Sequence, residues 1–292
     1  MINASEANND IRPLTPREFE QIRTLAYEKF GLSLREGKET LVSARLGKKI
    51  RELNFNSFQQ YYQHVVGDSS GEALVALIDA LTTNHTSFFR EPIHFEFLRE
   101  KVLPQVRDRE RIAIWSAACS TGEEPYSIAA CIQEEWGEAG LSRLRILATD
   151  ISTRALKKAQ NAVYPAERFE GIPVQQLRPF LLRGNGESRG LYRVKPQVRG
   201  AVEFARVNLM ESLSHLGPFS VIFCRNVMIY FDKPTQEGLV NRLAGCLEPG
   251  GYLFTGHSES LNGIKHPLKF VRAAIYRKAS PNEMETPRGL KK

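Results

Sequence analysis

Apolar positions recur at helical spacing from the N-terminal region to Thr83. Thr15, Pro16 and Glu18 form a capping box with proline at the first helical position, and Gly31 marks the end of the same helix. The pattern predicts four helices, over residues 16–30, 38–53, 57–66 and 72–83. Because no strand-like alternation interrupts this region, we predict a small all-helical N-terminal domain.

The pattern changes after Pro92. A helix is predicted over residues 94–102, closed by Pro104. Short apolar runs then alternate with helical segments, which favours a parallel sheet with crossover helices. The predicted strands cover residues 112–117, 144–148, 219–223, 252–255 and 271–277, and the predicted helices cover 125–136 and 234–247. The expected fold class is therefore α/β, with a Rossmann-like domain after the helical one.

This alternation breaks between Val163 and Val207, where glycines and a Tyr-Pro pair punctuate the chain. Residues 191–194 and 201–207 are predicted as short antiparallel strands. We therefore expect a small antiparallel β-subdomain, residues 163–206, inserted in the α/β domain. The polar tail, residues 281–292, is predicted to be disordered.

Composition and charge indicate the compartment and the type of partner of the protein. The chain has 292 residues, of which 42% are apolar, and none of its apolar runs reaches the ~18 residues that a membrane span needs. The N-terminus lacks an apolar signal-peptide core, and the four cysteines form no C-x-x-C pair. These features favour a cytoplasmic protein with reduced thiols. The net charge of +7 favours an acidic partner, which could be a nucleic acid, an anionic surface or an acidic protein.

A candidate cofactor loop follows the strand predicted over residues 112–117. Ala118, Ser120 and Gly122 are small at alternate positions, which lets the backbone approach a nucleoside, although an ordinary strand–helix turn has the same look. Asp150 ends the next strand, where a carboxylate can accept both ribose hydroxyls. No phosphate-binding signature accompanies them, so a nucleoside without phosphates, such as S-adenosylmethionine, fits best. Glu123 or Glu124 could meet its amino group or serve the helix dipole.

Seven segments together resemble the CheR family of chemotaxis receptor methyltransferases. They are residues 81–91 (LTTNHTSFFRE), 116–126 (SAACSTGEEPY), 148–150 (ATD), 207–209 (VNL), 222–232 (IFCRNVMIYFD), 247–251 (LEPGG) and 256–259 (GHSE). The resemblance spans nearly the whole chain. It implies a helical domain and linker over residues 14–90, and an S-adenosylmethionine-binding domain over residues 91–280 that carries the inserted β-subdomain.

The resemblance also implies roles for individual residues. Asn84, Thr86 and Arg90 would contact the cofactor from the linker, Glu124 and Asp150 would hold its amino-acid and ribose parts, Asn208 and Leu209 would flank adenine, and Arg225 and Asn226 would complete the site. Arg90 and Tyr230 would lie closest to the reacting groups. The triplet His257-Ser258-Glu259 is expected to line the site or to be structural and not to form a catalytic triad, because adjacent residues on a strand face opposite ways. No metal is expected.

The implied reaction is methyl transfer to a glutamate carboxylate of a receptor, which leaves S-adenosylhomocysteine. A glutamate with a pKa near ~4.3 is already a nucleophile at neutral pH, so no general base is needed. A nucleic-acid methyltransferase is the main alternative, but residues 225–228 read RNVM and lack the Asn/Asp-Pro-Pro-aromatic motif of amino-methylating enzymes. A non-catalytic S-adenosylmethionine-binding regulator is a third possibility. We expect neither a nucleic-acid substrate nor direct membrane insertion.

Two surfaces are candidates for receptor binding. In the helix predicted over residues 38–53, Arg45, Lys48 and Arg51 step by three along one side, and Leu46, Ile50 and Leu53 mark the expected buried side. The basic side would meet the helical cytoplasmic region of the receptor, although each residue alone fits a solvated face. The inserted β-subdomain would bind a C-terminal receptor peptide, or else be a structural hairpin over the cofactor pocket.

Overall fold

The computed structural model describes residues 11–83 and 85–284. The chain forms two compact units, the first ending at Asn84 and the second beginning at His85. Among the described residues, no helix is both long enough and apolar enough to cross a lipid bilayer. Each unit is taken in turn below.

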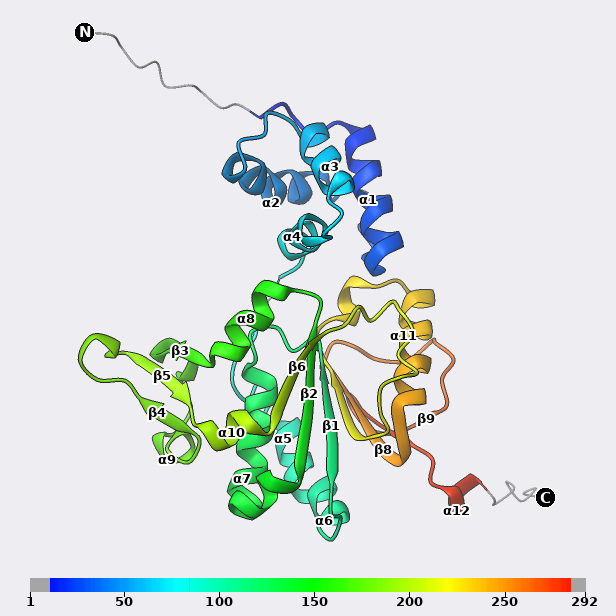
Figure 1. The fold of residues 1–292 in the computed structure, drawn as a ribbon. Coiled ribbons are helices and arrows are strands. Elements are labelled where there is room, and N and C mark those ends of the chain that lie inside the picture. The colour runs from blue at the N-terminus through cyan, green and yellow to red at the C-terminus, as the bar shows by residue number, and fades with distance from the viewer. Residues whose placement is uncertain (1–10, 84, 285–292) are drawn as a thin grey trace, which may run out of the picture. The chain divides into compact units, whose positions relative to one another are not determined.

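The first unit is all-helical, as predicted. Its helices are α1 (Pro16–Phe30), α2 (Glu39–Glu52), α3 (Phe58–Gly67) and α4 (Glu72–Leu81), shown in blue to cyan in Figure 1. The capping box is confirmed, because the Thr15 amide donates to the Glu18 carboxylate at 2.8 Å and the Glu18 amide to the Thr15 hydroxyl at 3.3 Å. Gly31 ends α1 with a φ of 69°. Leu53 is 43% exposed, contrary to expectation, because α2 ends one residue before it.

The second unit is built on a seven-stranded sheet with the order β6-β2-β1-β7-β8-β10-β9. The strands are β1 (Ile112–Ala117), β2 (Leu144–Asp150), β6 (Val202–Arg206), β7 (Phe219–Cys224), β8 (Leu247–Thr255), β9 (Leu268–Arg272) and β10 (Ile275–Lys278). The first five in spatial order are parallel, and β10 is antiparallel to both its neighbours. The principal crossover helices are α7 (Glu123–Arg143), α8 (Thr153–Asn161) and α11 (Lys233–Cys246). The Rossmann-like α/β prediction is confirmed.

The inserted antiparallel sheet is also present, in the order β3 (Val163–Pro165), β5 (Leu191–Val194), β4 (Leu181–Arg183). Shorter helical elements accompany it: η2 (Ala166–Phe169), α9 (Val174–Leu177), η3 (Gly186–Ser188) and α10 (Pro196–Gly200). The expectation that residues 201–207 belong to the inserted sheet is wrong, because β6 pairs in parallel with β2 in the main sheet. An apolar run this short does not reveal which sheet it joins.

Three further predicted boundaries differ from the structure. Residues 271–277 are not one strand but parts of the β9–β10 hairpin, which turns at Ala274 with a φ of 61°. Pro104 does not close its helix: α5 (Ile93–Phe97) continues through the π-helical turn η1 (Leu98–Val102) into α6 (Leu103–Val106). The wider π turn accommodates a proline that lacks an N–H. Residues 281–284 of the expected disordered tail form a short helix, α12 (Pro281–Met284).

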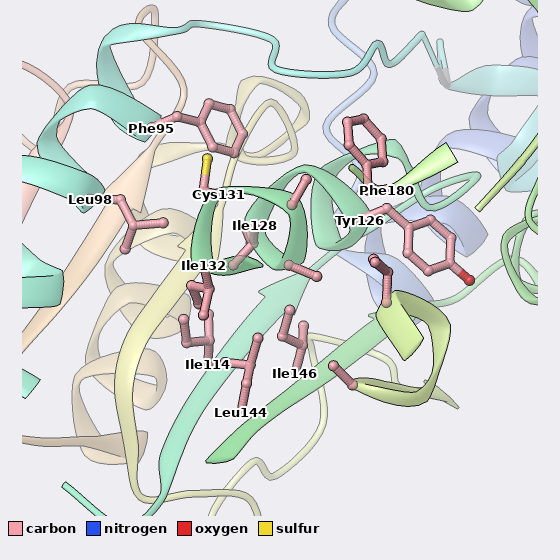
Figure 2. Packing of buried hydrophobic residues seen from close by; sticks show 14 of the residues in the cluster. Phe95, Leu98, Ile114, Tyr126, Ile128, Cys131, Ile132, Leu144, Ile146 and Phe180 are labelled. Atoms are coloured by element: carbon pink, nitrogen blue, oxygen red, sulfur yellow. The ribbon is translucent and has the colours of Figure 1, made fainter. Parts of the chain in front are cut away.

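The sheet of the second unit is buried on both faces. Consecutive strand residues point to opposite sides, so Ile114 packs with Ile128 and Ile132 of α7, whereas Trp115 belongs to the cluster that includes α11. Figure 2 shows the α7 side, with Ile128 and Ile132 over Ile114 and Ile146. Burying each such side chain contributes roughly 1.5–3 kcal/mol. This core fixes the carboxyl ends of the parallel strands, where the candidate site residues lie.

Candidate active site

The loop between β1 and α7 is strained and tightly packed. Ala118 and Ser120 have φ angles of 64° and 50°, in a region that costs a residue with a Cβ roughly 1–3 kcal/mol. Gly122, with a φ of 94°, has no room for a side chain, because a Cβ there would lie 2.8 Å from Cβ of Ala159 and 2.9 Å from the Tyr164 hydroxyl. The small residues of this loop are therefore required, because at Gly122 the backbone packs directly against Ala159 and Tyr164.

Asp150 joins this loop to the end of the neighbouring strand. One carboxylate oxygen accepts the Ser120 amide at 2.8 Å, and the other accepts the Ser152 amide at 2.9 Å. The hydroxyl oxygen of Ser120 is buried and makes no hydrogen bond with the described part of the chain. A buried hydroxyl without a partner is costly, so it is a ready contact for a polar ligand.

Arg225, directly after β7, lies at the centre of a buried ion-pair cluster. Its side chain is 2% exposed, and its guanidinium donates to Glu124 at 3.0 Å and to Glu91 at 2.9 Å. It also donates to the Arg90 carbonyl, while Glu124 accepts the Ser116 hydroxyl at 2.7 Å. Two residues that the family resemblance selected, Glu124 and Arg225, are thus in direct contact. With both carboxylates ionised and one guanidinium, the cluster has a net charge of −1.

The two carboxylates of this cluster are perturbed in opposite directions. Burial raises the pKa of Glu124, and Arg225 opposes this only in part. Burial also acts to raise the pKa of Glu91, but the Arg225 ion pair and three further hydrogen-bond contacts outweigh it, so that pKa is lowered. Glu91 therefore stays ionised at neutral pH.

Glu91 received no role from the sequence, although it lies in one of the matching segments. Its carboxylate also accepts the Asn226 side-chain amide and the His257 backbone amide, each at 3.3 Å. Nδ1 of the fully buried His94 lies 3.4 Å from it. The only sequence signal was its place beside Arg90 and before a helix, which does not reveal a contact with Arg225.

Glu91, His94 and His257 are also the residue types that hold metal ions, and one potential ligand atom from each lies within 4.8 Å of the others. The charge of Glu91 is already matched by Arg225 at 2.9 Å. A metal ion there would stand beside a guanidinium cation, which costs Coulomb energy in a buried site. We therefore assign Glu91 to the ion-pair cluster and not to a metal centre.

The remaining predicted cofactor residues lie on loops after other strands or on the linker. Asn208 follows β6 and accepts the Met210 amide at 3.0 Å, and the carbonyl of the buried Leu209 accepts Arg242 at 2.8 Å. Tyr230 is half-buried in the turn η4 (Met228–Tyr230) after β7. On the linker, the Arg90 guanidinium donates to the His85 carbonyl at 2.7 Å, and the Thr86 carbonyl accepts Arg168 at 3.0 Å. Asn84 lies outside the described residues.

Family comparisons account for nearly the whole chain. Residues 17–82 match the CheR methyltransferase all-alpha domain, and residues 84–277 match the CheR methyltransferase S-adenosylmethionine-binding domain. This chain belongs to the CheR methyltransferase family. It is 42% identical to chemotaxis protein methyltransferase 2 of Pseudomonas aeruginosa, covering 90% of this chain and 93% of that one. It is 39% identical to the chemotaxis protein methyltransferase of Salmonella typhimurium, covering 90% of both chains.

S-adenosylmethionine is accordingly the methyl donor of this CheR-family enzyme, and the described residues fit it. Its sulfonium and ammonium groups are cations, which suit a cluster that holds two carboxyl groups, Glu91 and Glu124, around one guanidinium, and whose Glu91 stays ionised. Asp150 accepts the Ser120 amide in the neighbouring loop, which brings a carboxylate beside a turn of small residues, as a nucleoside site requires. The individual contacts of the predicted residues with the cofactor remain predictions.

In the helical domain of the CheR-family chain, the three predicted basic residues are not equivalent. Arg45 is half-buried and donates to the Leu81 carbonyl and to the Thr83 hydroxyl, so it ties α2 to the end of α4. Lys48 and Arg51 are exposed. Of the three predicted basic residues, Lys48 and Arg51 are therefore the ones that α2 leaves exposed.

Proposed function

We propose that this enzyme acts in the cytoplasm and methylates glutamate side chains of chemotaxis receptors, forming methyl esters and releasing S-adenosylhomocysteine. The observation that carries the proposal is the buried Glu91–Arg225–Glu124 cluster at the carboxyl end of the parallel sheet. Its charge suits a cationic cofactor, and the acceptor then needs no activation by a base. The curated relatives from Pseudomonas aeruginosa and Salmonella typhimurium, which are named chemotaxis protein methyltransferases, support the choice of substrate.

The residues of the chain then act by holding and orienting. S-adenosylmethionine supplies a methyl group already activated on a sulfonium. Asp150, Glu124 and Arg225 would hold the donor, together with linker residues and residues around the nucleoside: Asn84, Thr86, Arg90, Asn208, Leu209 and Asn226. Tyr230 would face the methyl and the incoming carboxylate. Fixed in-line geometry of this kind is worth effective molarities of roughly 10⁵ M or more.

The transfer reaction distinguishes the candidate substrates. We would incubate the full chain and tritiated S-adenosylmethionine with receptor membranes, with RNA, or with no acceptor. Label in the receptor that is released by mild base shows a carboxyl methyl ester and supports the proposal. Label in RNA, or base-stable label in protein, overturns it.

Receptor docking is proposed to use the exposed residues Lys48 and Arg51 against an acidic, helical receptor surface. Reversing both to Glu should lower methylation of receptor several-fold without changing the affinity for S-adenosylmethionine, and activity of the unmodified enzyme should fall with added salt. Lys157→Glu with Lys158→Glu on α8 changes the charge equally on exposed positions and is the matched control. Equal receptor methylation by the two double variants would show that α2 is only a solvated face.

A receptor C-terminal peptide is proposed to add to the inserted sheet, because β4 pairs on one side only and its Leu182 is 47% exposed. Gly184→Val should disrupt this edge, since a Cβ there would lie 2.2 Å from the Ser188 carbonyl oxygen. We expect lost peptide binding with unchanged transfer to receptor fragments that lack the peptide. If the wild-type chain binds no such peptide at millimolar concentration, the sheet has a structural role only.

A further inference from the structure

The loop that follows β7, residues 225–230, carries three of the proposed site residues. Asn226 begins its turn with a left-handed φ of 58°, which is uncommon for a residue with a side chain. Inside the loop, the Tyr230 amide donates to the Val227 carbonyl at 3.2 Å. A bond this local closes the turn but does not attach it to the rest of the unit. The Gln236 side chain of α11 donates to the Met228 carbonyl at 2.9 Å in the middle of the loop, but the ends of the turn need an attachment of their own.

Glu259 makes that attachment. It lies just beyond the end of β8 and is 6% exposed. One carboxylate oxygen accepts the Asn226 amide at 2.8 Å and the Gly256 amide at 2.6 Å, and the other accepts the Ile229 amide at 3.1 Å. Both ends of the turn are therefore bonded to one side chain. Hydrogen bonds from N–H groups to a carboxylate are about twice as strong as those between neutral groups.

The surroundings of Glu259 show that this arrangement leaves little freedom. None of the ion pairs within the described ranges 11–83 and 85–284 includes Glu259, so main-chain N–H groups alone compensate its burial. At Gly256, a Cβ would lie 2.6 Å from the Asn226 side-chain nitrogen and 2.7 Å from the Glu259 carboxylate. Burying a carboxylate is expensive, and an apolar residue would stabilise the fold at least as well.

We propose that Glu259 is a positioning residue for methyl transfer, which holds the 225–230 loop so that Asn226 and Tyr230 face the cofactor and the acceptor. It acts through these residues and does not touch the reacting groups. The inference rests on the proposed function of the loop, because it assigns Glu259 a purpose only if Asn226 and Tyr230 belong to the site. A purely structural role for Glu259 would affect only the fraction of folded molecules. A positioning role also affects the catalytic rate of the molecules that are correctly folded.

Glu259→Gln tests the proposal with a side chain of the same shape. Its amide places a donor where one oxygen had accepted main-chain N–H groups, so at least one end of the turn is released. We expect the Kd for S-adenosylhomocysteine to rise and kcat per folded molecule to fall, each about tenfold or more, as for one lost hydrogen bond to a charged group. The control is Glu248→Gln on strand β8. It breaks the exposed ion pair between Glu248 and Arg109 and should leave both the Kd and kcat unchanged.

Gly256→Ala provides a second, independent variant, because it keeps the carboxylate and intrudes on its contacts with Asn226. It should reproduce the losses in Kd and kcat. Hydrogen exchange on the unmodified chain should show slow Asn226 and Ile229 amides. Fast exchange of both amides, or wild-type kcat and Kd in both variants, overturns the role of Glu259. The Kd for S-adenosylhomocysteine can be measured by calorimetry without a methyl acceptor. A failure of receptor methylation would therefore refute the proposed function and leave the test of Glu259 intact.

Discussion

Replacing Arg225 by Met removes the guanidinium that pairs with both Glu91 and Glu124. It keeps a long apolar stem over the Phe95 ring, whose centroid lies 5.9 Å from the guanidinium carbon. Two carboxylates whose side chains are only 13% and 12% exposed then lose their cation. Breaking a buried pair from one side costs about 3–5 kcal/mol, and we expect the free energy of unfolding to fall by that amount at pH 7.5. Urea unfolding followed by tryptophan fluorescence measures this, because both tryptophans, Trp115 and Trp136, belong to the second unit.

The pH dependence gives this prediction a second check. Without Arg225, burial is no longer opposed by a cation, and the pKa values of Glu91 and Glu124 should both lie above their ordinary value. The folded state then binds more protons than the unfolded one, so lowering the pH from 7.5 towards 5 should shrink the penalty. Arg145→Met, which breaks an exposed pair with Glu203, should cost at most about 1 kcal/mol at either pH. A penalty for Arg225→Met no larger than this control would refute the buried-cluster argument.

Three other perturbations have defined outcomes. Asp150→Ala should weaken S-adenosylmethionine binding by roughly 1–3 kcal/mol in calorimetry, and unchanged affinity would remove Asp150 from the site. Gly122→Ala should lower the melting temperature, because its Cβ meets Ala159 at 2.8 Å and its φ is 94°; an unchanged melting temperature would show that the loop relaxes. Burial lowers the pKa of His94 from 6.5 to about 3, so between these two pH values the unfolded state is protonated and the folded state is not, and stability falls as the pH drops through this range. At pH 5 the loss is about 2 kcal/mol, at ~1.4 kcal/mol per pH unit, and His94→Gln should lack it; parallel pH profiles of unfolding for the two proteins would contradict this.

Features decided by neighbouring residues were predicted well. The capping box at Thr15 and Glu18 and the stop at Gly31 depend on contacts within one helical turn or cap, and the structure has them as expected. The turn between β1 and α7 and the position of Asp150 at the end of β2 follow from the alternation of strand and helix. The adjacency of these two ends in space also follows, since β1 and β2 pair in parallel.

The missed features depend on residues far apart in the chain. Glu91 and Arg225 are separated by 134 positions, and Arg45 and the Leu81 carbonyl by 36. The spacing of residues in the sequence does not indicate pairs that are this far apart in the chain. Glu259 lies in a segment that was expected to be lining or structural, but its partners are backbone amides of Asn226 and Ile229, which any sequence would supply. Side-chain identity therefore cannot reveal the contact.

The β9–β10 hairpin leaves β9 at one edge of the seven-stranded sheet. Its last four residues, Lys269, Phe270, Val271 and Arg272, are all exposed, with a cation at each end of an apolar pair. Of these two cations, Lys269 also lies 3.4 Å from the Glu283 carboxylate. An edge strand can pair with the same strand of another molecule, but antiparallel pairing of two β9 strands would place Lys269 of one opposite the like-charged Arg272 of the other. Salt screens that repulsion, so concentrated samples of this protein should self-associate more readily at high ionic strength than at low.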